Sequence, residues 1–203
     1  GFVVFWLVTI DRIDHGATGI DFFSYKWFEV GSVQLTWGII VDPLTIVMLG
    51  LVTFVALMVQ VYSIGYMRGD SRFGWYFALH SLFAASMLTV VLADNFLLLY
   101  IAWELVGLCS YLLIGFWYEL RSASEAAKKA FITTRIADVA LLTGILLLFK
   151  EVGTFSMQET FHQAELLMSG APSALSSTTA TASAILLFVG AMGKSAQFPF
   201  HVW

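Results

Sequence analysis

The sequence predicts an all-α polytopic membrane protein, a transmembrane helix bundle with one discontinuous helix and a small extramembrane β-hairpin. Two observations support this prediction. Of the 203 residues, 59% are hydrophobic and only 12% are charged, whereas a typical soluble domain is about 25% charged. Several apolar stretches are also about 20 residues long, which is the length that crosses the hydrocarbon core of a bilayer. This composition argues against a soluble enzyme and against a disordered chain.

Charge, cysteine content and motifs exclude further classes of protein. The formal net charge of −4 argues against a protein that binds nucleic acid, because such proteins carry an excess of basic residues. The single cysteine, Cys109, excludes an internal disulfide framework and any metal site built from several thiolates. The sequence contains no glycine-rich nucleotide loop and no nucleophile elbow. We therefore expect no cofactor and no metal in this chain.

The first 41 residues precede the first complete span. Residues 1–10 are apolar but only half a span long, so we expect them to be the end of a truncated helix. Residues 11–41 are expected to form an extramembrane loop. Within it, residues 25–30 and 33–41 are rich in β-forming residues on either side of Gly31 and Ser32, a pattern typical of a hairpin. We expect this hairpin to lie on the membrane surface.

Four complete spans are predicted at about residues 42–61, 75–92, 95–116 and 130–149. Asp42 is expected to cap the first span, because its carboxylate can accept the free backbone N–H groups at the helix start. Pro43 fits the first helical position, where a backbone donor is not needed. Asp94 is an acceptor at the start of the third span. Ser122 and Glu125 have the spacing of a capping box before the fourth span. A fifth span is expected to begin near Ser183 and to be interrupted by Pro199, because proline removes a helical hydrogen bond.

The connection at residues 150–182 contains a second capping box at Ser156 and Glu159, which predicts a short amphipathic helix ending near Met168. A flexible loop is expected to follow it. We interpret residues 1–203 as part of one membrane domain, in which residues 42–203 form a bundle that is incomplete at its C-terminus.

The distribution of charge in the loops predicts the orientation of the spans. The side that holds residues 62–74 and 117–129 carries five basic and three acidic residues. The opposite side, with residues 11–41, 93–94 and 150–182, carries three basic and eight acidic residues. Since cytoplasmic loops are enriched in Lys and Arg, we expect the first side to be cytoplasmic.

Four charged residues are predicted to lie at membrane depth: Glu104, Arg135, Asp138 and Lys194. Exposure of each to lipid would cost about 2.5–3.5 kcal/mol. They must therefore face the bundle interior, pair with one another or line water. An acid, a base and a broken helix at this depth indicate an ion path, although an Arg135–Asp138 pair alone could be a structural staple.

The surroundings of two of these charges support the same interpretation. Glu104 shares a helical stripe with Tyr100 and Tyr111, whose hydroxyl groups could reach its carboxylate, and Gly107 permits close approach of a neighbour. Lys194 lies in a patch of small and polar residues. His80 and His201 are weaker candidates for proton relay, because a lone histidine is more often a hydrogen-bonded core residue.

Five sequence blocks resemble a known family. The longest, from Asp94 to Trp117, is DNFLLLYIAWELVGLCSYLLIGFW. Two others are KAFITTRIAD at residues 129–138 and GKSAQFPFHVW at residues 193–203, and shorter blocks occur at 42–44 and 62–67. In order across residues 35–203, they resemble the proton-translocating subunit L of bacterial NADH–quinone oxidoreductase, the equivalent of subunit 5 of respiratory complex I.

The resemblance implies an antiporter-like bundle in which Glu104 and Lys194 form the charge pair of a half-channel, with Asp138 and Arg135 on the helix between them. It implies a subunit of an oxidoreductase that exports protons, with the redox chemistry in other subunits. NADH, FMN, iron–sulfur clusters and quinone would bind to those partner subunits. The implied surroundings are the other membrane subunits of the complex and the lipid bilayer of a bacterial inner or plasma membrane.

Two alternatives remain open from the sequence. One is the related membrane subunit of a multisubunit Na⁺/H⁺ antiporter, which shares the fold, the glutamate and a similar Lys-Ser-Ala-Gln block. The run at residues 106–111 favours the respiratory subunit. The other is a membrane scaffold without transport, in which Glu104 and Lys194 would be dispensable.

Overall fold

A bundle of long helices dominates the computed structural model, which describes residues 2–14, 21–30 and 33–203. The elements in chain order are α1 (Phe2–Asp14), β1 (Asp21–Val30), β2 (Val33–Val41), α2 (Pro43–Tyr66), α3 (Phe73–Leu92), α4 (Phe96–Ile114), α5 (Arg121–Val152), α6 (Met157–Ser169) and α7 (Ser177–Lys194). Helices α2 to α5 are long and apolar enough to cross a membrane. The four complete spans expected from the sequence are therefore confirmed.

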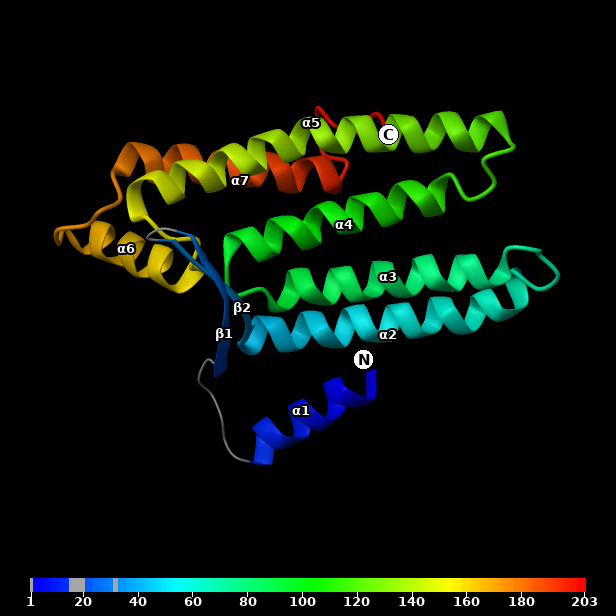
Figure 1. Cartoon of the computed structure of the whole chain (residues 1–203), viewed down its shortest axis with the longest axis horizontal. Coiled ribbons are helices and arrows are strands. Elements are labelled where there is room, and N and C mark those ends of the chain that lie inside the picture. The colour runs from blue at the N-terminus through cyan, green and yellow to red at the C-terminus, as the bar shows by residue number, and fades with distance from the viewer. Residues whose placement is uncertain (1, 15–20, 31–32) are drawn as a thin grey trace.

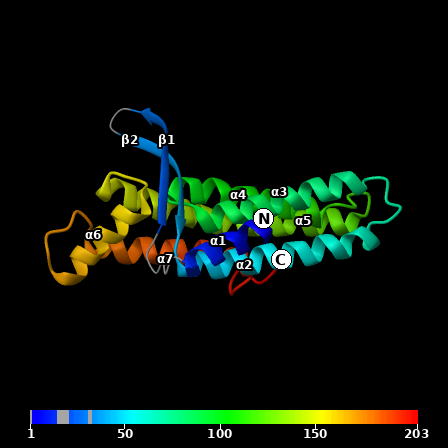
Figure 2. The same cartoon turned by 90° about the horizontal axis from the view of Figure 1, so that it is seen from below.

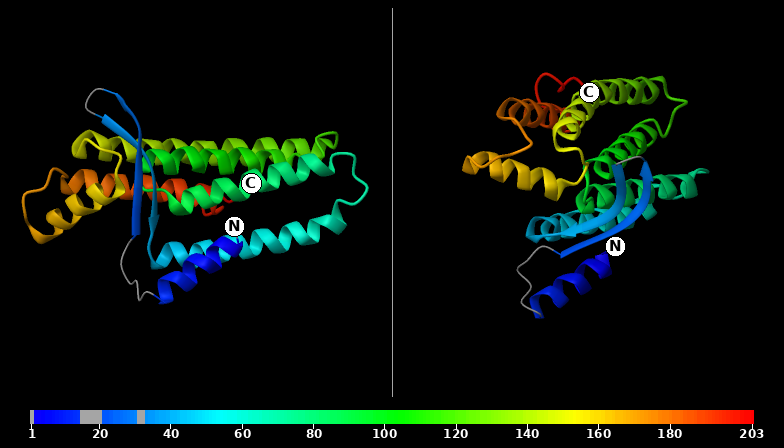
Figure 3. Two further views of the ribbon diagram at one scale, coloured as in Figure 1. Left: turned by 60° about the horizontal axis from the view of Figure 1, so that its bottom comes forward. Right: turned by 60° about the vertical axis from the view of Figure 1, so that its left-hand side comes forward.

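The spans run up and down beside one another, with short turns between α2 and α3 and between α4 and α5 at one end of the bundle (Figure 1). The hairpin and α6 lie at the other end. In Figure 3, α5 and α7 lie side by side, and α1 and α2 lie at the opposite side of the bundle. Many apolar side chains of α2 are exposed, as expected for a helix that contacts lipid.

Two predicted helix starts are confirmed and two are wrong. The Asp42 carboxylate accepts the backbone N–H of Thr45, and Ser156 caps α6. The cap of α4 is Asn95, which accepts from the backbone N–H of Leu98, and not Asp94. The Asp94 carboxylate instead faces the hairpin.

The expected capping box at Ser122 and Glu125 does not cap a helix. Helix α5 begins at Arg121 without a side-chain cap, so Ser122 already lies inside the first turn. This helix has 32 residues and extends beyond the predicted 130–149 at both ends. Its polar first turns lie at the end of the bundle, where water can satisfy the free backbone donors.

The predicted hairpin is confirmed as an antiparallel pair of β1 and β2, and it runs across the helix axes and extends beyond the helices (Figure 2). Strand β1 begins at Asp21, earlier than expected, and α1 continues to Asp14, so residues 11–14 are helical and not part of a loop. The expected turn at Gly31 and Ser32 lies outside the described residues. Thr36 of β2 donates to the Asp94 carboxylate at 3.1 Å, which ties the hairpin to the α3–α4 turn.

Helix α7 differs from the predicted fifth span at both ends. It begins at Ser177, where a flexible loop was expected, and it ends at Lys194, before Pro199. Ala196 adopts a left-handed backbone conformation with φ 50°, and the N–H of Gln197 bonds to the carbonyl of Met192 at 3.1 Å. This is the Schellman pattern that closes a helix. The helix therefore stops before proline can interrupt it, partway along α5 (Figure 1).

Candidate functional site

Three helices bring the four predicted membrane charges together in the middle of the bundle. Glu104 lies midway along α4, Arg135 and Asp138 lie midway along α5, and Lys194 is the last residue of α7. Because α7 ends partway along α5, its terminal lysine lies beside Asp138. The charges alternate in sign along a row, Glu104, Arg135, Asp138 and Lys194, which we call the charge row.

Arg135 joins the first two helices of the charge row. Its guanidinium forms an ion pair with the Glu104 carboxylate, and Nη2 donates to the Glu104 backbone carbonyl at 3.0 Å. The ring of Phe131 lies 4.5 Å from the guanidinium carbon. An aromatic face stabilises a cation that is shielded from water. The arginine is thus anchored to α4 by its head group.

Asp138 is the most deeply buried member, with 2% of its side chain exposed. Its Oδ2 atom lies 3.6 Å from Arg135 Nη1 and 3.5 Å from Lys194 Nζ. Its Oδ1 atom accepts a 2.7 Å hydrogen bond from the indole Nε1 of Trp103. A buried carboxylate needs such compensation because removal of a charge from water costs several kcal/mol. Asp138 is therefore shared between two cations.

Several polar atoms of the charge row have no hydrogen-bond partner among the described residues. They are Glu104 Oε1, Arg135 Nε, Asp138 Oδ2 and Lys194 Nζ. A buried polar atom without a partner costs about 1–3 kcal/mol. The row is thus not closed into a single saturated network, and its members retain capacity to form new bonds. Among the described residues, Oε2 of Glu104 pairs with Arg135 and Oε1 has no hydrogen-bond partner, so the expected contacts with Tyr100 and Tyr111 are not formed.

Close packing of α5 against α7 places Lys194 in the row. A Cβ on Gly190 would lie 2.7 Å from the Cβ of Leu141, and one on Gly193 would overlap Ala137. The two helices can only lie this close because glycine has no side chain. The small residues that the sequence analysis assigned to a polar patch around Lys194 therefore form the helix contact.

Gly107 of α4 makes room for both cations. A Cβ at this position would lie 2.5 Å from Lys194 Nζ and 2.8 Å from Arg135 Nη2. The close approach that the sequence predicted at Gly107 is therefore made by two charged side chains, and not by a helix backbone.

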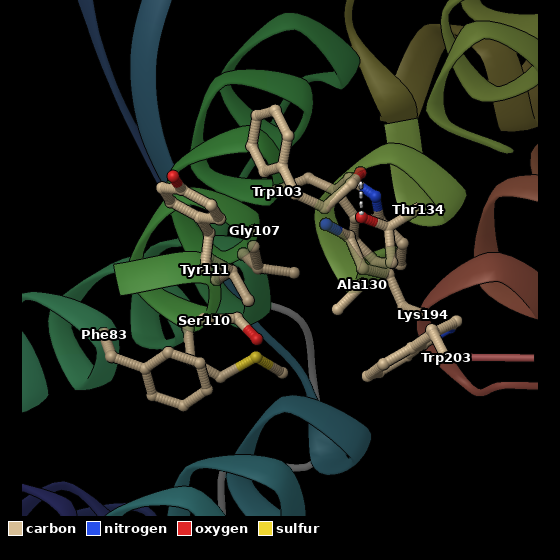
Figure 4. A pocket seen from close by; sticks show the side chains of 13 residues that line it. Phe83, Trp103, Gly107, Ser110, Tyr111, Ala130, Thr134, Lys194 and Trp203 are labelled. Atoms are coloured by element: carbon tan, nitrogen blue, oxygen red, sulfur yellow. Dashed lines mark hydrogen bonds between the residues drawn. The ribbon is translucent and has the colours of Figure 1, made fainter. Parts of the chain in front are cut away.

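A cavity of about 360 Å³ opens beside Lys194 (Figure 4). Helices α3, α4 and α5, the last residue of α7 and the end of the chain line it, with Phe83, Gly107, Tyr111, Thr134, Lys194 and Trp203 among the lining residues. Most of the wall is apolar or aromatic. Among the lining residues, the lysine supplies the charged group at the edge of this space.

The structure also separates residues that the sequence analysis had grouped together. His80 stacks with Tyr76 in α3, and its Nδ1 has no hydrogen-bond partner among the described residues. The exposed His201 stacks with Phe198. Within the described part of the chain, no ion pair joins either histidine to the charge row. Glu104 and Lys194 are not paired directly, because Arg135 and Asp138 lie between them. The roles of all six residues in transport stay predictions.

Trp103 is the member of the site that the sequence analysis missed. It precedes Glu104 in α4, hydrogen-bonds Asp138 and lies with its ring 5.7 Å from Lys194 Nζ. One signal was present in the sequence. An indole N–H in the middle of an apolar span needs a hydrogen-bond partner, and Asp138 was a predicted acceptor at the same depth.

Two family models match the chain. Residues 93–203 match "NADH:quinone oxidoreductase/Mrp antiporter, TM", and residues 27–77 match "NADH-Ubiquinone oxidoreductase (complex I), chain 5 N-terminus". The first match covers the charge row, and the second covers the end of β1, β2, α2 and the start of α3. Together, the two matched regions include all five sequence blocks that carry the resemblance.

Curated relatives carry matching names. The chain is 47% identical over 178 residues to NAD(P)H-quinone oxidoreductase chain 5 of Synechocystis, which covers 88% of this chain and 26% of the relative. It is 46% identical to NADH-quinone oxidoreductase subunit L of Rickettsia felis, in a match that covers 87% of this chain and 27% of the relative. It is 44% identical to F(420)H(2) dehydrogenase subunit L of Methanosarcina mazei, in a match that covers 89% of this chain and 28% of the relative. The chain thus spans about a quarter of the length of these relatives.

Solved structures share the fold. A chain of the Mrp complex from Dietzia superposes with a TM-score of 0.78 at 31% identity, covering 95% of this chain and 20% of that one. A chain of an archaeal membrane-bound sulfane sulfur reductase superposes with a TM-score of 0.69 at 18% identity, covering 100% and 30%. The second likeness shows the fold alone. Both agree with an antiporter-like helix bundle.

Proposed function

The chain belongs to the NADH:quinone oxidoreductase/Mrp antiporter transmembrane family, and we propose on this basis that it is part of a proton-translocating subunit of a quinone oxidoreductase complex. Other subunits transfer electrons to quinone, and this subunit uses the energy to export protons across the membrane. The observation that carries the proposal is the charge row in the middle of the bundle.

The alternation of sign along the charge row supports proton transfer. A proton that reaches Glu104 neutralises its carboxylate and weakens the ion pair with Arg135. Arg135 then turns to Asp138, 3.6 Å away, and competes there with Lys194. A lysine that loses its carboxylate partner gives up its proton more easily. A proton at one end of the row is thereby coupled to proton release at the other.

The names of the relatives support an assignment of the redox chemistry to other subunits. They specify different electron donors, NAD(P)H, NADH and F(420)H(2), for subunits that are 44–47% identical to this chain. A segment common to all three is not what selects the donor. We propose that NADH or a related donor, FMN, iron–sulfur clusters and quinone bind to partner subunits, and that the described helices form one membrane domain.

A second candidate function is a subunit of a Na⁺/H⁺ antiporter. The likeness to a chain of the Mrp complex, with a TM-score of 0.78, favours it. In that case the same charge row would exchange Na⁺ for protons without an electron donor. The two candidates differ in what drives transport.

The test uses membrane vesicles that contain the complete subunit within its complex. Glu104→Gln and Lys194→Ala each remove one end of the charge row, and we expect both to lower the number of protons pumped per electron. Glu125→Gln and Lys129→Ala are matched controls, because these two residues lie exposed at the end of the bundle. Pumping by both test variants at the level of the controls would favour a scaffold. Transport that requires Na⁺ and no electron donor would favour the antiporter.

A further inference from the structure

Trp103 contacts two members of the charge row with two different parts of its side chain. The indole Nε1 donates to Asp138 Oδ1 at 2.7 Å. The ring presents its face to Lys194, whose Nζ lies 5.7 Å from the ring centroid. Trp103 and Lys194 also line the same cavity (Figure 4). Trp103 packs against the core cluster that includes Leu141, so its orientation is fixed by its apolar surroundings.

The hydrogen bond from Trp103 makes the two oxygens of Asp138 unequal. Oδ1 is held by the indole, whereas Oδ2 lies between Arg135 and Lys194 at nearly equal distances of 3.6 and 3.5 Å. A carboxylate that could rotate would turn both oxygens toward one cation, because a two-point ion pair with arginine is favoured. The indole N–H opposes that rotation and leaves a single oxygen for both cations.

The aromatic face gives Lys194 a second stabilising contact. When Arg135 moves onto Asp138, the lysine loses electrostatic compensation from the carboxylate. A cation at the face of an indole is attracted by the ring quadrupole. The lysine therefore need not leave the site when its carboxylate partner is taken by Arg135.

We propose that Trp103 is a positioning residue for proton transfer along the charge row: it keeps Asp138 shared between Arg135 and Lys194 and supports the lysine when the sharing ends. This inference rests on the proposed proton-translocating function. The Trp103 side chain thereby prevents either Arg135 or Lys194 from binding Asp138 permanently.

The test compares Trp103→Phe, Trp103→Leu and the control Trp75→Phe in membrane vesicles that contain the complete subunit within its complex. Phenylalanine keeps a ring and removes the donor, whereas leucine removes both. Trp75 is 55% exposed on α3 and lies outside the charge row. We expect Trp103→Phe to slow proton pumping about tenfold, the change in population that follows loss of a hydrogen bond to a charged group, and Trp103→Leu to slow it further. Pumping by Trp103→Phe at the rate of the Trp75→Phe control would overturn the proposal.

A spectroscopic measurement separates positioning from packing. The ultraviolet resonance Raman band that reports hydrogen bonding of the indole N–H is assigned to Trp103 by subtracting the spectrum of Trp103→Phe. In Asp138→Asn, which keeps Trp103, the spectrum should show a weaker hydrogen bond, because the amide oxygen is a neutral acceptor. If Trp103→Phe does not assemble, the difference between the spectra of wild type and Asp138→Asn itself isolates the band of the indole that is bonded to Asp138. A spectrum unchanged by Asp138→Asn would show that Trp103 acts through packing.

The outcomes also separate this inference from the proposed function. If Glu104→Gln and Lys194→Ala pump normally, the proposed function itself fails. If those variants lose pumping and Trp103→Phe does not, only the role of Trp103 is wrong.

Discussion

Each buried charge in the bundle is compensated by its neighbours, and the two central members of the charge row are each shared between two partners. Arg135 contacts Glu104 and Asp138, and Asp138 contacts Arg135 and Lys194. A buried ion pair stabilises a protein little against an apolar alternative of the same shape. Shared, incompletely bonded partners are consistent with the proposed movement of charge along the row.

Gly107 provides a prediction about the position of the two cations of the charge row. In Gly107→Ala, the new methyl group meets Lys194 Nζ and Arg135 Nη2, the ends of two flexible side chains that can move aside. We expect fewer protons per electron, because the cations are displaced from Asp138, and a loss of about 1–3 kcal/mol in the free energy of unfolding, the usual cost of overpacking. Gly65→Ala is the control, since no atom lies within 4 Å of a Cβ there. Normal pumping by Gly107→Ala would show that the cations need not approach α4.

The sequence predicted the identity of the four charged residues but not their pairing. Depth along a helix follows from counting residues at about 1.5 Å each, and the cost of a charge in lipid then demands a partner. Which partner depends on the rotation and height of separate helices, which one sequence does not specify. For this reason the sequence placed Arg135 on the same face as Asp138 but did not show that it pairs with Glu104, and Trp103 was overlooked.

At the scale of elements, the contact between α5 and α7 determines where Lys194 lies. Gly190 and Gly193 bring the end of α7 against Leu141 and Ala137. The left-handed Ala196 then ends the helix one residue after its cap, Ser195. The sequence predicted an interruption from Pro199. It could not place the end of the helix at Lys194, because a left-handed alanine is unusual and gives no signal in the composition.

Gly190→Ala tests this contact. The added methyl group would lie 2.7 Å from the Cβ of Leu141, an atom fixed to the backbone of α5, so the helices must separate. We expect a loss of about 1–3 kcal/mol in the free energy of unfolding, the usual cost of overpacking. Thermal unfolding of the complete protein in detergent measures it, with Gly65→Ala as the matched control. An unchanged melting temperature would contradict the close packing of α5 and α7.

At the scale of the whole molecule, polar contacts tie the two ends of the bundle. At one end, the indole of Trp117 donates to Asp70 at 3.0 Å, and Arg72 pairs with Glu119 at 3.0 Å, which joins the α2–α3 and α4–α5 turns. At the other end, the hairpin is tied to the α3–α4 turn through Asp94. The spans between these ties present mainly apolar side chains to lipid. The four spans could be predicted from the sequence, because apolar segments of this length cross a bilayer as helices that bond their backbone groups internally.

The contact at Asp70 predicts a pH dependence. The backbone N–H of Arg72 and the indole of Trp117 lower the pKa of Asp70 from its ordinary value of 3.8. Since the pKa is lowered in the folded state, the ionised carboxylate stabilises the contact fully above about pH 3.8. That stabilisation is lost as the pH falls through the lowered pKa.

Hydrogen exchange of the Arg72 backbone amide, corrected for the intrinsic effect of pH, measures this dependence. We expect protection to decrease below pH 3.8 in the wild type. In Asp70→Asn, which cannot ionise, protection should not change with pH. Protection that decreases equally in both proteins would show that Asp70 does not hold the turn.

If the charge row moves protons as proposed, Asp138 is its key residue, because both cations contact it. The most direct measurement is the number of protons pumped per electron in vesicles that contain the complete subunit with Asp138→Asn, compared with the exposed control Glu125→Gln. We predict that electron transfer continues in both variants and that the ratio falls only in Asp138→Asn, because a neutral amide cannot be exchanged between Arg135 and Lys194. Equal ratios in the two variants would contradict the account.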